Sequence, residues 1–257
     1  MKKIAVILIL FAYHNVYAQT YMRVNFKNGN ATTFGVANID SIVYHSTTCP
    51  VLTDVDGNNY SVVAIGNRCW MKENLKTTHY NDGTPISTGL NNNDWQNTLS
   101  GAYSDYNNDS TISAVYGRLY NWYAVANPAG LCPTGWHVPS DADWSLLVKY
   151  IDPQADTFCL ACTQSQVAGG MMKSTGTQYW LSPNTGATNQ SGFSGLPAGN
   201  RNFNGTFNNI GSSGYWWSAT ELSSAIAWDR NLFYNGGDEY RVNYYKVFGF
   251  SVRCLRD

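Results

Sequence analysis

Residues 131–144 read LCPTGWHVPSDADW, and this stretch determines where a helix begins. Ser140 is the predicted N-cap, and Asp143 follows three positions later, where it closes a capping box. Apolar residues then recur at helical spacing. We expect the buried side of the helix to carry Trp144, Leu147, Val148 and Ile151. The dipeptide Asp152-Pro153 ends the pattern, because the residue before a proline disfavours helical geometry.

The other polar residues of this stretch have structural roles in the same interpretation. Asp141 and Asp143 are first-turn acids, which the helix dipole favours, so they need no catalytic role. Pro133 and Pro139 fix the path of the chain into the helix. His137 could be a ligand, but a lone histidine of this kind is more often packed in a core, and that is our expectation.

Two further patterns outline the fold. In residues 117–128, GRLYNWYAVANP, Leu119, Trp122, Tyr123 and Ala126 have helical spacing, which predicts a second helix that ends at Asn127. From residue 192 onward the pattern is β. It predicts strands at residues 215–221 and 225–232, a turn at 235–237, and a last strand with Phe248, Phe250, Val252 and Cys254 on one face.

An acidic run near residue 54 raises the question of calcium. Asp54, Asp56 and Asn58 alternate as in an EF-hand loop, but the glycine and the twelfth-position glutamate of that loop are not in place. Strand-like residues flank the run. We therefore expect a hairpin turn with Asp and Gly as turn residues.

Composition limits the classes of function. Charged residues make up 13% of the chain, about half the usual share, and 16 basic residues face 17 acidic ones. The chain therefore has no overall attraction for nucleic acid or acidic lipid. Hydrophobic residues make up 44%, enough for one large domain with a small appendage.

The N-terminus resembles an export signal. Lys2 and Lys3 precede an apolar run too short to span a bilayer, and small residues then precede a predicted cleavage before Gln19. We expect residues 1–18 to be a signal peptide, residues 19–48 a short β module, and residues 49–257 the main domain. No membrane span is expected, and the mature protein is predicted to be secreted, periplasmic or on the cell surface.

Six cysteines fit an oxidising compartment, and they allow fifteen pairings. Only Cys159 and Cys162 have metal-like CxxC spacing, and no second pair lies near them. The motif lies in an apparent loop rather than between a strand and a helix, so a thioredoxin-like role is not expected. A local disulfide between the two is the preferred interpretation.

Several segments resemble a known family. The segments DVDGNNYSVVAIGNRCWMKENLKTT, YGRLYNWYAV, LCPTGWHVPSDADW, GFSGLPAGNR, GYWWSATE and GFSVRCLRD closely resemble the Fibrobacter succinogenes major paralogous domain, over about residues 49–257. The short module before them resembles small β segments at the front of secreted Bacteroidetes proteins. The family is itself similar to the C-type-lectin-like fold of formylglycine-generating proteins, whose RLPTEAEW and GFRC motifs are similar to HVPSDADW and GFSVRC.

This resemblance implies an α+β fold: a C-type-lectin-like arrangement of two helices packed on a twisted, mostly antiparallel sheet, with long loops on one side. It also implies a disulfide between Cys132 and Cys254, which joins the lead-in to the capped helix with the final strand. We pair the remaining cysteines as Cys49 with Cys69 and Cys159 with Cys162.

An enzymatic role is not favoured. Formylglycine-generating proteins use two active-site cysteines and copper shortly before the GFRC strand, but residues 217–253 here contain no cysteine. The chain has no HExxH or GxSxG motif either. We expect no catalytic residue, no metal and no cofactor. The EPN and WND motifs of calcium-dependent lectins are also missing, so calcium-bridged sugar binding in their manner is not expected.

A binding module is the favoured interpretation, because nine Trp and eighteen Tyr with many amides suit stacking and hydrogen bonding. We expect the ligand surface on the long segment 182–214 and the adjoining strands. The predicted ligand-binding residues are Asn200, Arg201, Asn202, Asn204, Trp216 and Trp228. Arg201 has an equally good structural interpretation, tying the loop down. Strand alternation places Trp216 and Trp217 on opposite faces, so one of them is expected near the surface. A glycan or an extracellular protein is the expected partner; a structural or adhesion role without a small ligand is the alternative.

Overall fold

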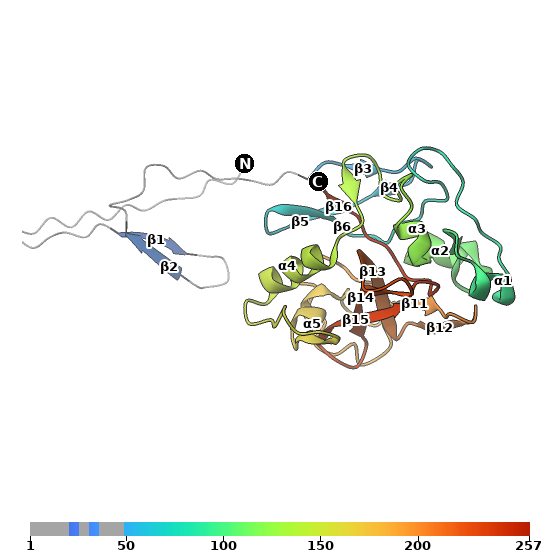
Figure 1. The fold of residues 1–257 in the computed structure, drawn as a ribbon. Helices are drawn as coiled ribbons and strands as arrows, with labels where there is room; N and C mark the ends of the chain where they lie inside the picture. Colours follow the sequence, from blue (N-terminus) through green and yellow to red (C-terminus); the bar gives the residue numbers. More distant parts are fainter. Residues whose placement is uncertain (1–20, 26–30, 36–48) are drawn as a thin grey trace, which may run out of the picture. The chain divides into compact units, whose positions relative to one another are not determined.

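The computed structural model describes residues 21–25, 31–35 and 49–257, which belong to two separate units (Figure 1). In the first unit, β1 (Tyr21–Asn25) and β2 (Ala31–Gly35) form an antiparallel hairpin, with Tyr21 opposite Gly35. This hairpin lies within the predicted β module. The predicted signal peptide and the rest of that module lie outside the described residues.

The second unit mixes short helices with mostly antiparallel strands, as an α+β fold requires. Its helices are α1 (Asn92–Asn97), the 3-10 helix η2 (Tyr106–Asn108), α2 (Ser110–Tyr116), α3 (Trp122–Val125), α4 (Asp141–Ile151) and α5 (Ala168–Met172). Its strands are β3 (Leu52–Thr53), β4 (Asn59–Tyr60), β5 (Val62–Ile65), β6 (Arg68–Met71), β7 (Tyr103–Ser104), β8 (Leu119–Tyr120), β9 (Trp136–His137), β10 (Cys162–Ser165), β11 (Ala198–Arg201), β12 (Phe207–Ile210), β13 (Ser213–Glu221), β14 (Ile226–Phe233), β15 (Glu239–Tyr245) and β16 (Leu255–Arg256).

A four-stranded sheet in the order β10-β15-β14-β13 forms the centre of this unit, and every neighbouring pair in it is antiparallel. A second four-stranded sheet has the order β5-β6-β16-β9. Helix α4 packs on β13 and β14 while α5 packs on β15, so both helices cover the same side of the central sheet (Figure 1). The pairs β3-β4, β7-β8 and β11-β12 complete the strands.

The capped helix is confirmed. Ser140 accepts a hydrogen bond from the backbone of Asp143, whose side chain accepts from the backbone of Ser140, so the capping box is complete. Trp144, Leu147 and Val148 are buried as predicted, whereas Ile151 is only half-buried. The helix ends at Ile151, with Asp152 as its C-cap.

The second predicted helix is much shorter than its pattern indicates. Only Trp122–Val125 is helical, because Leu119 and Tyr120 pair with β7 instead. Asn121 then caps the short helix, its side chain accepting from the backbone N–H of Ala124. Backbone pairing with distant strands, which helical spacing does not reveal, overrode the local pattern here.

The β11–β12 hairpin and helix α5 are among the elements that the sequence pattern did not predict. The segment 182–214 was expected to be a loop, but it contains the β11–β12 hairpin, in which Asn200 lies opposite Asn208. Helix α5 has the sequence AGGMM, and glycine is a poor helix former. Gly170 is needed there because a Cβ atom would overlap the carbonyl oxygen of Gly186.

In the central sheet, β13 and β14 match the predicted strands at residues 215–221 and 225–232, whereas β10 and β15 were not predicted. The predicted last strand differs from the structure. Residues 248–252 connect through single bridges, such as Tyr120 with Phe250 and Trp216 with Ser251, and only Leu255–Arg256 forms a named strand. Ser251 and Arg253 are as buried as Val252, so this segment has no solvent-facing side.

The core has a layer on each face of the central sheet. Trp216 packs with Trp144 and Phe193 under α4, whereas Trp217 packs with Phe250 on the opposite face. The predicted opposite orientation of the two tryptophans is therefore confirmed. Both side chains are fully buried, however, so the prediction that one lies near the surface is wrong.

Two of the three predicted disulfides are confirmed. Cys132 bonds Cys254 and Cys49 bonds Cys69, with Cα–Cα distances of 5.9 and 5.5 Å. Cys159 and Cys162, at a sequence separation of 3, lie next to each other with a Cα–Cα distance of 6.0 Å, which is within reach of the third predicted disulfide. The Cys132–Cys254 bond joins the segment before α4 to the final strand, so it fixes the chain end against the capped helix.

In the part of the chain that the structure describes, no helix has both the length and the apolar character needed to cross a bilayer.

Candidate ligand-binding surface

The predicted ligand residues Asn200 and Arg201 are buried in the β11–β12 hairpin, 4% and 1% exposed. The Arg201 guanidinium lies 4.2 Å from the ring centre of Trp95. Its Nε donates to the Gly205 carbonyl at 3.1 Å, and its Nη2 donates to the Leu90 carbonyl at 2.6 Å. These contacts favour the structural one of the two roles predicted for Arg201, because they fasten the hairpin to the segment before α1.

Asn202 and Asn204 lie at the turn of the same hairpin and use their side chains locally. The Asn202 Oδ1 accepts from the backbone of Phe203, and the Asn204 Oδ1 accepts from both the backbone and the hydroxyl of Thr206. The turn also needs Gly205, whose φ is +83°. The two asparagines thus shape a turn that presents Phe203, which is 44% exposed.

The two predicted tryptophans lie inside the domain. Trp216 donates from Nε1 to the Oδ1 of Asn74 at 2.8 Å and is fully buried. Trp228 is 5% exposed, and the Arg241 guanidinium covers it at 3.8 Å from the ring centre. Neither ring is free to stack on a ligand, so their predicted direct contact with one is wrong for this conformation.

A different group of rings reaches the surface beside the hairpin. We name it the aromatic ladder; its members are Phe203, Phe248, Tyr244, Tyr215, Phe233 and Tyr240. Successive ring centres lie 5.8, 5.0, 6.2, 6.4 and 5.2 Å apart in that order. Phe203 is exposed and Phe233, Tyr240 and Tyr244 are half-buried, while the other two are buried. The ladder thus runs from the hairpin turn across β13, β14 and β15.

The ladder has polar groups along it. The exposed Asn209 donates from Nδ2 to the Oδ1 of Asn200 and to the hydroxyl of Tyr215, both at 3.1 Å. Asn209 has a φ of +67°, a conformation that non-glycine residues adopt rarely and that is often found at functional sites. Its side chain therefore fixes both the hairpin and one tyrosine of the ladder.

A buried acid lies on the same face of the sheet. Asp229 is fully buried, and its Oδ1 has no hydrogen-bond partner among the described residues. With its amide oriented to donate, Asn231 places its Nδ2 2.5 Å from the Asp229 Oδ2. Burial raises the pKa of Asp229 well above its usual range. Burial, together with the nearby Asp229, also raises the pKa of Tyr244 to about 12, so the Tyr244 hydroxyl stays neutral at the surface.

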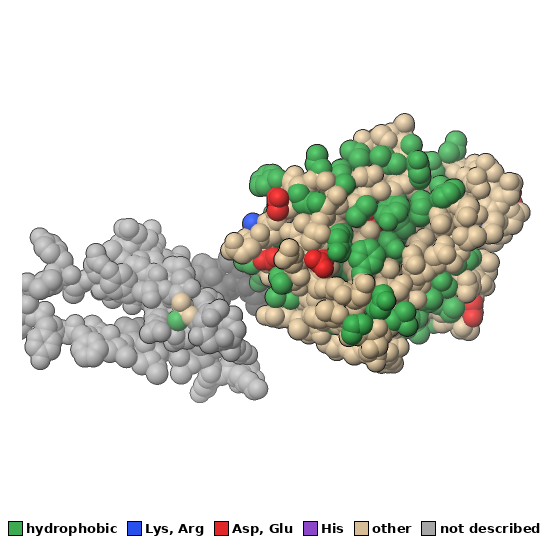
Figure 2. Space-filling model, turned by 90° about the horizontal axis from the view of Figure 1, so that it is seen from below, with side chains coloured by type: hydrophobic (Ala, Val, Ile, Leu, Met, Phe, Trp, Pro, Cys, Tyr) green, Lys and Arg blue, Asp and Glu red, His purple; other side chains and the backbone are tan. Residues whose placement is uncertain are grey.

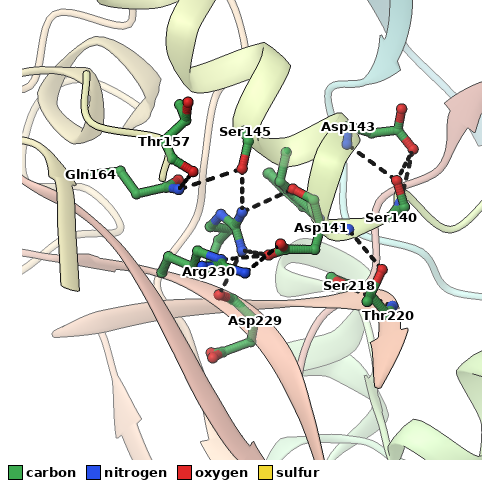
Figure 3. A network of polar contacts seen from close by, with 12 residues as sticks. Ser140, Asp141, Asp143, Ser145, Thr157, Gln164, Ser218, Thr220, Asp229 and Arg230 are labelled. Atoms are coloured by element: carbon green, nitrogen blue, oxygen red, sulfur yellow. Dashed lines mark hydrogen bonds and ion pairs between the residues drawn. The ribbon is translucent and has the colours of Figure 1, made fainter. Parts of the chain in front are cut away.

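The opposite face of the sheet has an ion network that joins α4 to β14 and β15. Asp141 accepts from Arg230 at 2.8 Å and from Arg241 at 2.7 and 2.9 Å. Figure 3 shows Arg230 directed toward Asp141 and Ser145, while the carboxylate of Asp229 points away from them. Although burial acts to raise it, the two arginines hold the pKa of Asp141 below its usual range. Asp141 is therefore more than a first-turn acid, since it docks the helix on the sheet.

The other acid of that turn also has a partner. Asp143 pairs with Arg68 in addition to its role in the capping box. His137 does not have the predicted core position: its side chain is 41% exposed, and its Nδ1 lies 2.5 Å from Asp257. The pairing of β9 with β16 brings this histidine to the C-terminal acid.

The acidic run at residue 54 forms the predicted hairpin turn between β3 and β4. The carboxylate of Asp54 accepts from the backbones of Asp56 and Asn58 and from the hydroxyl of Tyr60, so its oxygens are already engaged. No cluster of three or more His, Cys, Asp or Glu side chains suited to a metal ion occurs among the described residues.

One face of the second unit is poor in charged side chains. Figure 2 shows hydrophobic side chains gathered across the middle of one face, with few charged groups among them. Exposed large hydrophobic side chains outside the ladder include Leu146, Tyr150, Phe158 and Leu160.

These features define a class of protein: an α+β domain held by disulfides, with a central antiparallel sheet between a buried ion network and an aromatic ladder. The chain belongs to the Fibrobacter succinogenes major domain family, whose model matches residues 63–256. The resemblance found in the sequence is thus confirmed for the family. Neither the curated proteins nor the solved structures yielded a match.

Proposed function

We propose that the protein is an exported, non-enzymatic binding module, and that the aromatic ladder is its ligand surface. The single observation that supports this most is the continuous run of six rings that begins at an exposed phenylalanine and ends at a half-buried tyrosine. Such rings offer flat apolar faces, which stack on sugar rings or on apolar side chains. We also propose that the fold is C-type-lectin-like, in line with the family resemblance.

Polar groups beside the ladder support a glycan as the ligand. The exposed amide of Asn209 offers its Oδ1 as an acceptor, since its Nδ2 is engaged. The Tyr240 and Tyr244 hydroxyls offer further donors and acceptors at the half-buried edge of β15. With a net charge of −1, attraction over long distances is weak, so binding should depend little on salt.

A catalytic role in the manner of formylglycine-generating oxidases receives no support from the cysteines. Cys49, Cys69, Cys132 and Cys254 are paired in disulfides, so they offer no thiolate to copper. Cys159 and Cys162 do not lie shortly before the final strand, where the copper-binding cysteines of those proteins lie. A structural or adhesion role remains the second candidate, and it differs in its ligand: the ladder would then bind an envelope protein rather than a sugar.

The test is a glycan array and a panel of envelope proteins probed with residues 19–257. Phe203→Ala and Tyr240→Ala should each weaken the binding that is found by about tenfold or more, as expected for a stacking aromatic side chain. Tyr245→Ala is the matched control: Tyr245 is 58% exposed on the same strand, but alternation places it on the opposite face from Tyr244.

If both ladder variants bind like the unchanged protein, the site assignment is wrong. If purified protein turns over any substrate, the non-enzymatic assignment is wrong. Binding of an envelope protein and of no glycan would favour the second candidate.

A further inference from the structure

The Cys159–Cys162 disulfide differs from the other two in its surroundings. Cys69, Cys132 and Cys254 are 2%, 5% and 0% exposed, so each of the other bonds has at least one cysteine in the core. Cys159 and Cys162 are both half-buried; Cys159 lies in the segment between α4 and β10, and Cys162 is the first residue of β10. The side chains between and beside them point outward: Phe158 is 93% exposed and Leu160 is 73% exposed.

The sheet holds this motif at its edge. β10 is the outermost strand, and Cys162 lies opposite Arg241 of β15. The Arg241 Nη1 also donates to the Cys159 carbonyl at 2.8 Å. Both ends of the small ring are thus anchored to one arginine, so the ring keeps its place when the bond between the sulfur atoms opens.

The backbone conformation between the two cysteines favours opening of the disulfide. Ala161 has a φ of +51°, a left-handed conformation that residues other than glycine adopt at a cost. Reduction of the disulfide lets this residue leave that conformation. External thiols can also reach an exposed disulfide directly, whereas a disulfide in the core reacts only when the protein opens locally.

We propose that Cys159–Cys162 is a thiol–disulfide exchange site for a protein dithiol. A thiolate of the donor attacks one sulfur of the pair, the Cys159–Cys162 bond breaks, and the displaced cysteine leaves as a thiolate. The second thiolate of the donor then attacks the mixed disulfide at the donor's own sulfur. Two electrons and two protons pass to the pair, which ends as two thiols, and the donor ends as a disulfide. Phe158 and Leu160 form the apolar contact for the donor.

The first test uses dithiothreitol on native residues 19–257, followed by N-ethylmaleimide and peptide mapping. Cys159 and Cys162 should be labelled about a thousandfold or more faster than the other four cysteines, because those four become accessible only when the domain opens. The Cys159→Ser/Cys162→Ser double variant should take up no label over the same time. Label at either residue without reductant, or equal rates at all six, would overturn the proposal.

The second test concerns the donor contact and uses reduced thioredoxin as the protein dithiol. Phe158→Ser and Leu160→Ser should slow reduction by thioredoxin about five- to thirtyfold, the usual range for a lost apolar anchor. Their rates with dithiothreitol should not change. Leu222→Ser, an exposed apolar residue elsewhere on the unit, is the matched control. Equal thioredoxin rates in all variants would show that a protein donor does not use these two residues.

Discussion

Asp141→Asn tests whether the ion network, rather than the helix cap alone, holds α4 on the sheet. The carboxylate receives three charged hydrogen bonds from Arg230 and Arg241, whose side chains are 0% and 9% exposed. Breaking a buried ion pair costs about 3–5 kcal/mol, because the remaining charge loses its partner. Arg230 keeps Glu239 and Ser145 as partners, so we expect the lower end, about 3 kcal/mol.

The assay is urea unfolding followed by tryptophan fluorescence, with the free energy of unfolding taken by linear extrapolation. Asp143→Asn is the matched control on the same helical turn. Its partner Arg68 is 37% exposed, so the pair and the cap together should contribute only about 1 kcal/mol. If Asp141→Asn costs no more than Asp143→Asn, the ion network does not hold the helix.

The pH dependence gives a second check on the same residue. The pKa of Asp141 is lowered in the folded protein, so its stabilising contribution is fully present above the unfolded-state pKa, about 3.9. That contribution is lost as the pH falls through the folded-state pKa. The stability difference between Asp141→Asn and the unchanged protein should therefore shrink as the pH falls below about 3.9 and through the lower folded-state pKa.

Three further predictions concern other parts of the chain. Burial raises the pKa of Glu239 to about 7, although the charge of Arg230 opposes the rise. The fold therefore loses stability as the pH rises from the unfolded-state pKa, about 4.3, to about 7, and loses no more above that. Relative to the unchanged protein, Glu239→Gln should gain up to about 3 kcal/mol in urea unfolding between pH 5 and pH 8, and an unchanged difference would contradict the raised pKa. Trp144→Ala should lower the free energy of unfolding by about 3–5 kcal/mol, because the side chain is fully buried. Ser140→Ala should lower it by about 1 kcal/mol through the lost cap, and Tyr150→Ala, at a residue 64% exposed on the same helix, by less than about 0.5 kcal/mol. Equal losses for Tyr150→Ala and Trp144→Ala would refute the packing argument. Mass spectrometry of protein from the native host should find an N-terminus at or near Gln19, and an intact Met1 would contradict the predicted signal peptide.

The features that the sequence predicts well are those decided by neighbouring residues. The capping box of Ser140 and Asp143 needs only four residues, and the alternation around Trp216 and Trp217 needs only a strand. Sequence could not show the partners of Asp141, because Arg230 and Arg241 follow it by 89 and 100 positions. It could not separate helix from strand at Leu119 either, since the pairing that decides this comes from β7.

The burial of several predicted ligand residues was misjudged for a related reason. Polar residues in a Gly- and Asn-rich segment were taken as surface donors and acceptors, but Asn200 and Arg201 form a strand. The ladder draws its rings from the hairpin turn, from three strands and from residue 248, so no single stretch displays it. One local signal did exist: in β15, Tyr240, Val242 and Tyr244 alternate with Arg241 and Asn243.

The buried lysine and arginine side chains explain why charge in this sequence was a poor predictor of which residues lie at the surface. Irregular segments leave backbone carbonyls without strand or helix partners, and a buried carbonyl needs a donor. Lys173, fully buried, donates to the carbonyls of Thr185, Phe233 and Gly236. Arg253, equally buried, donates to those of Phe193 and Ser194. Long side chains with several N–H groups suit this task, because one of them can join segments far apart in the chain. In a domain with few charges and many loops, a lysine or arginine is therefore better interpreted as a clamp on the backbone than as part of a ligand surface.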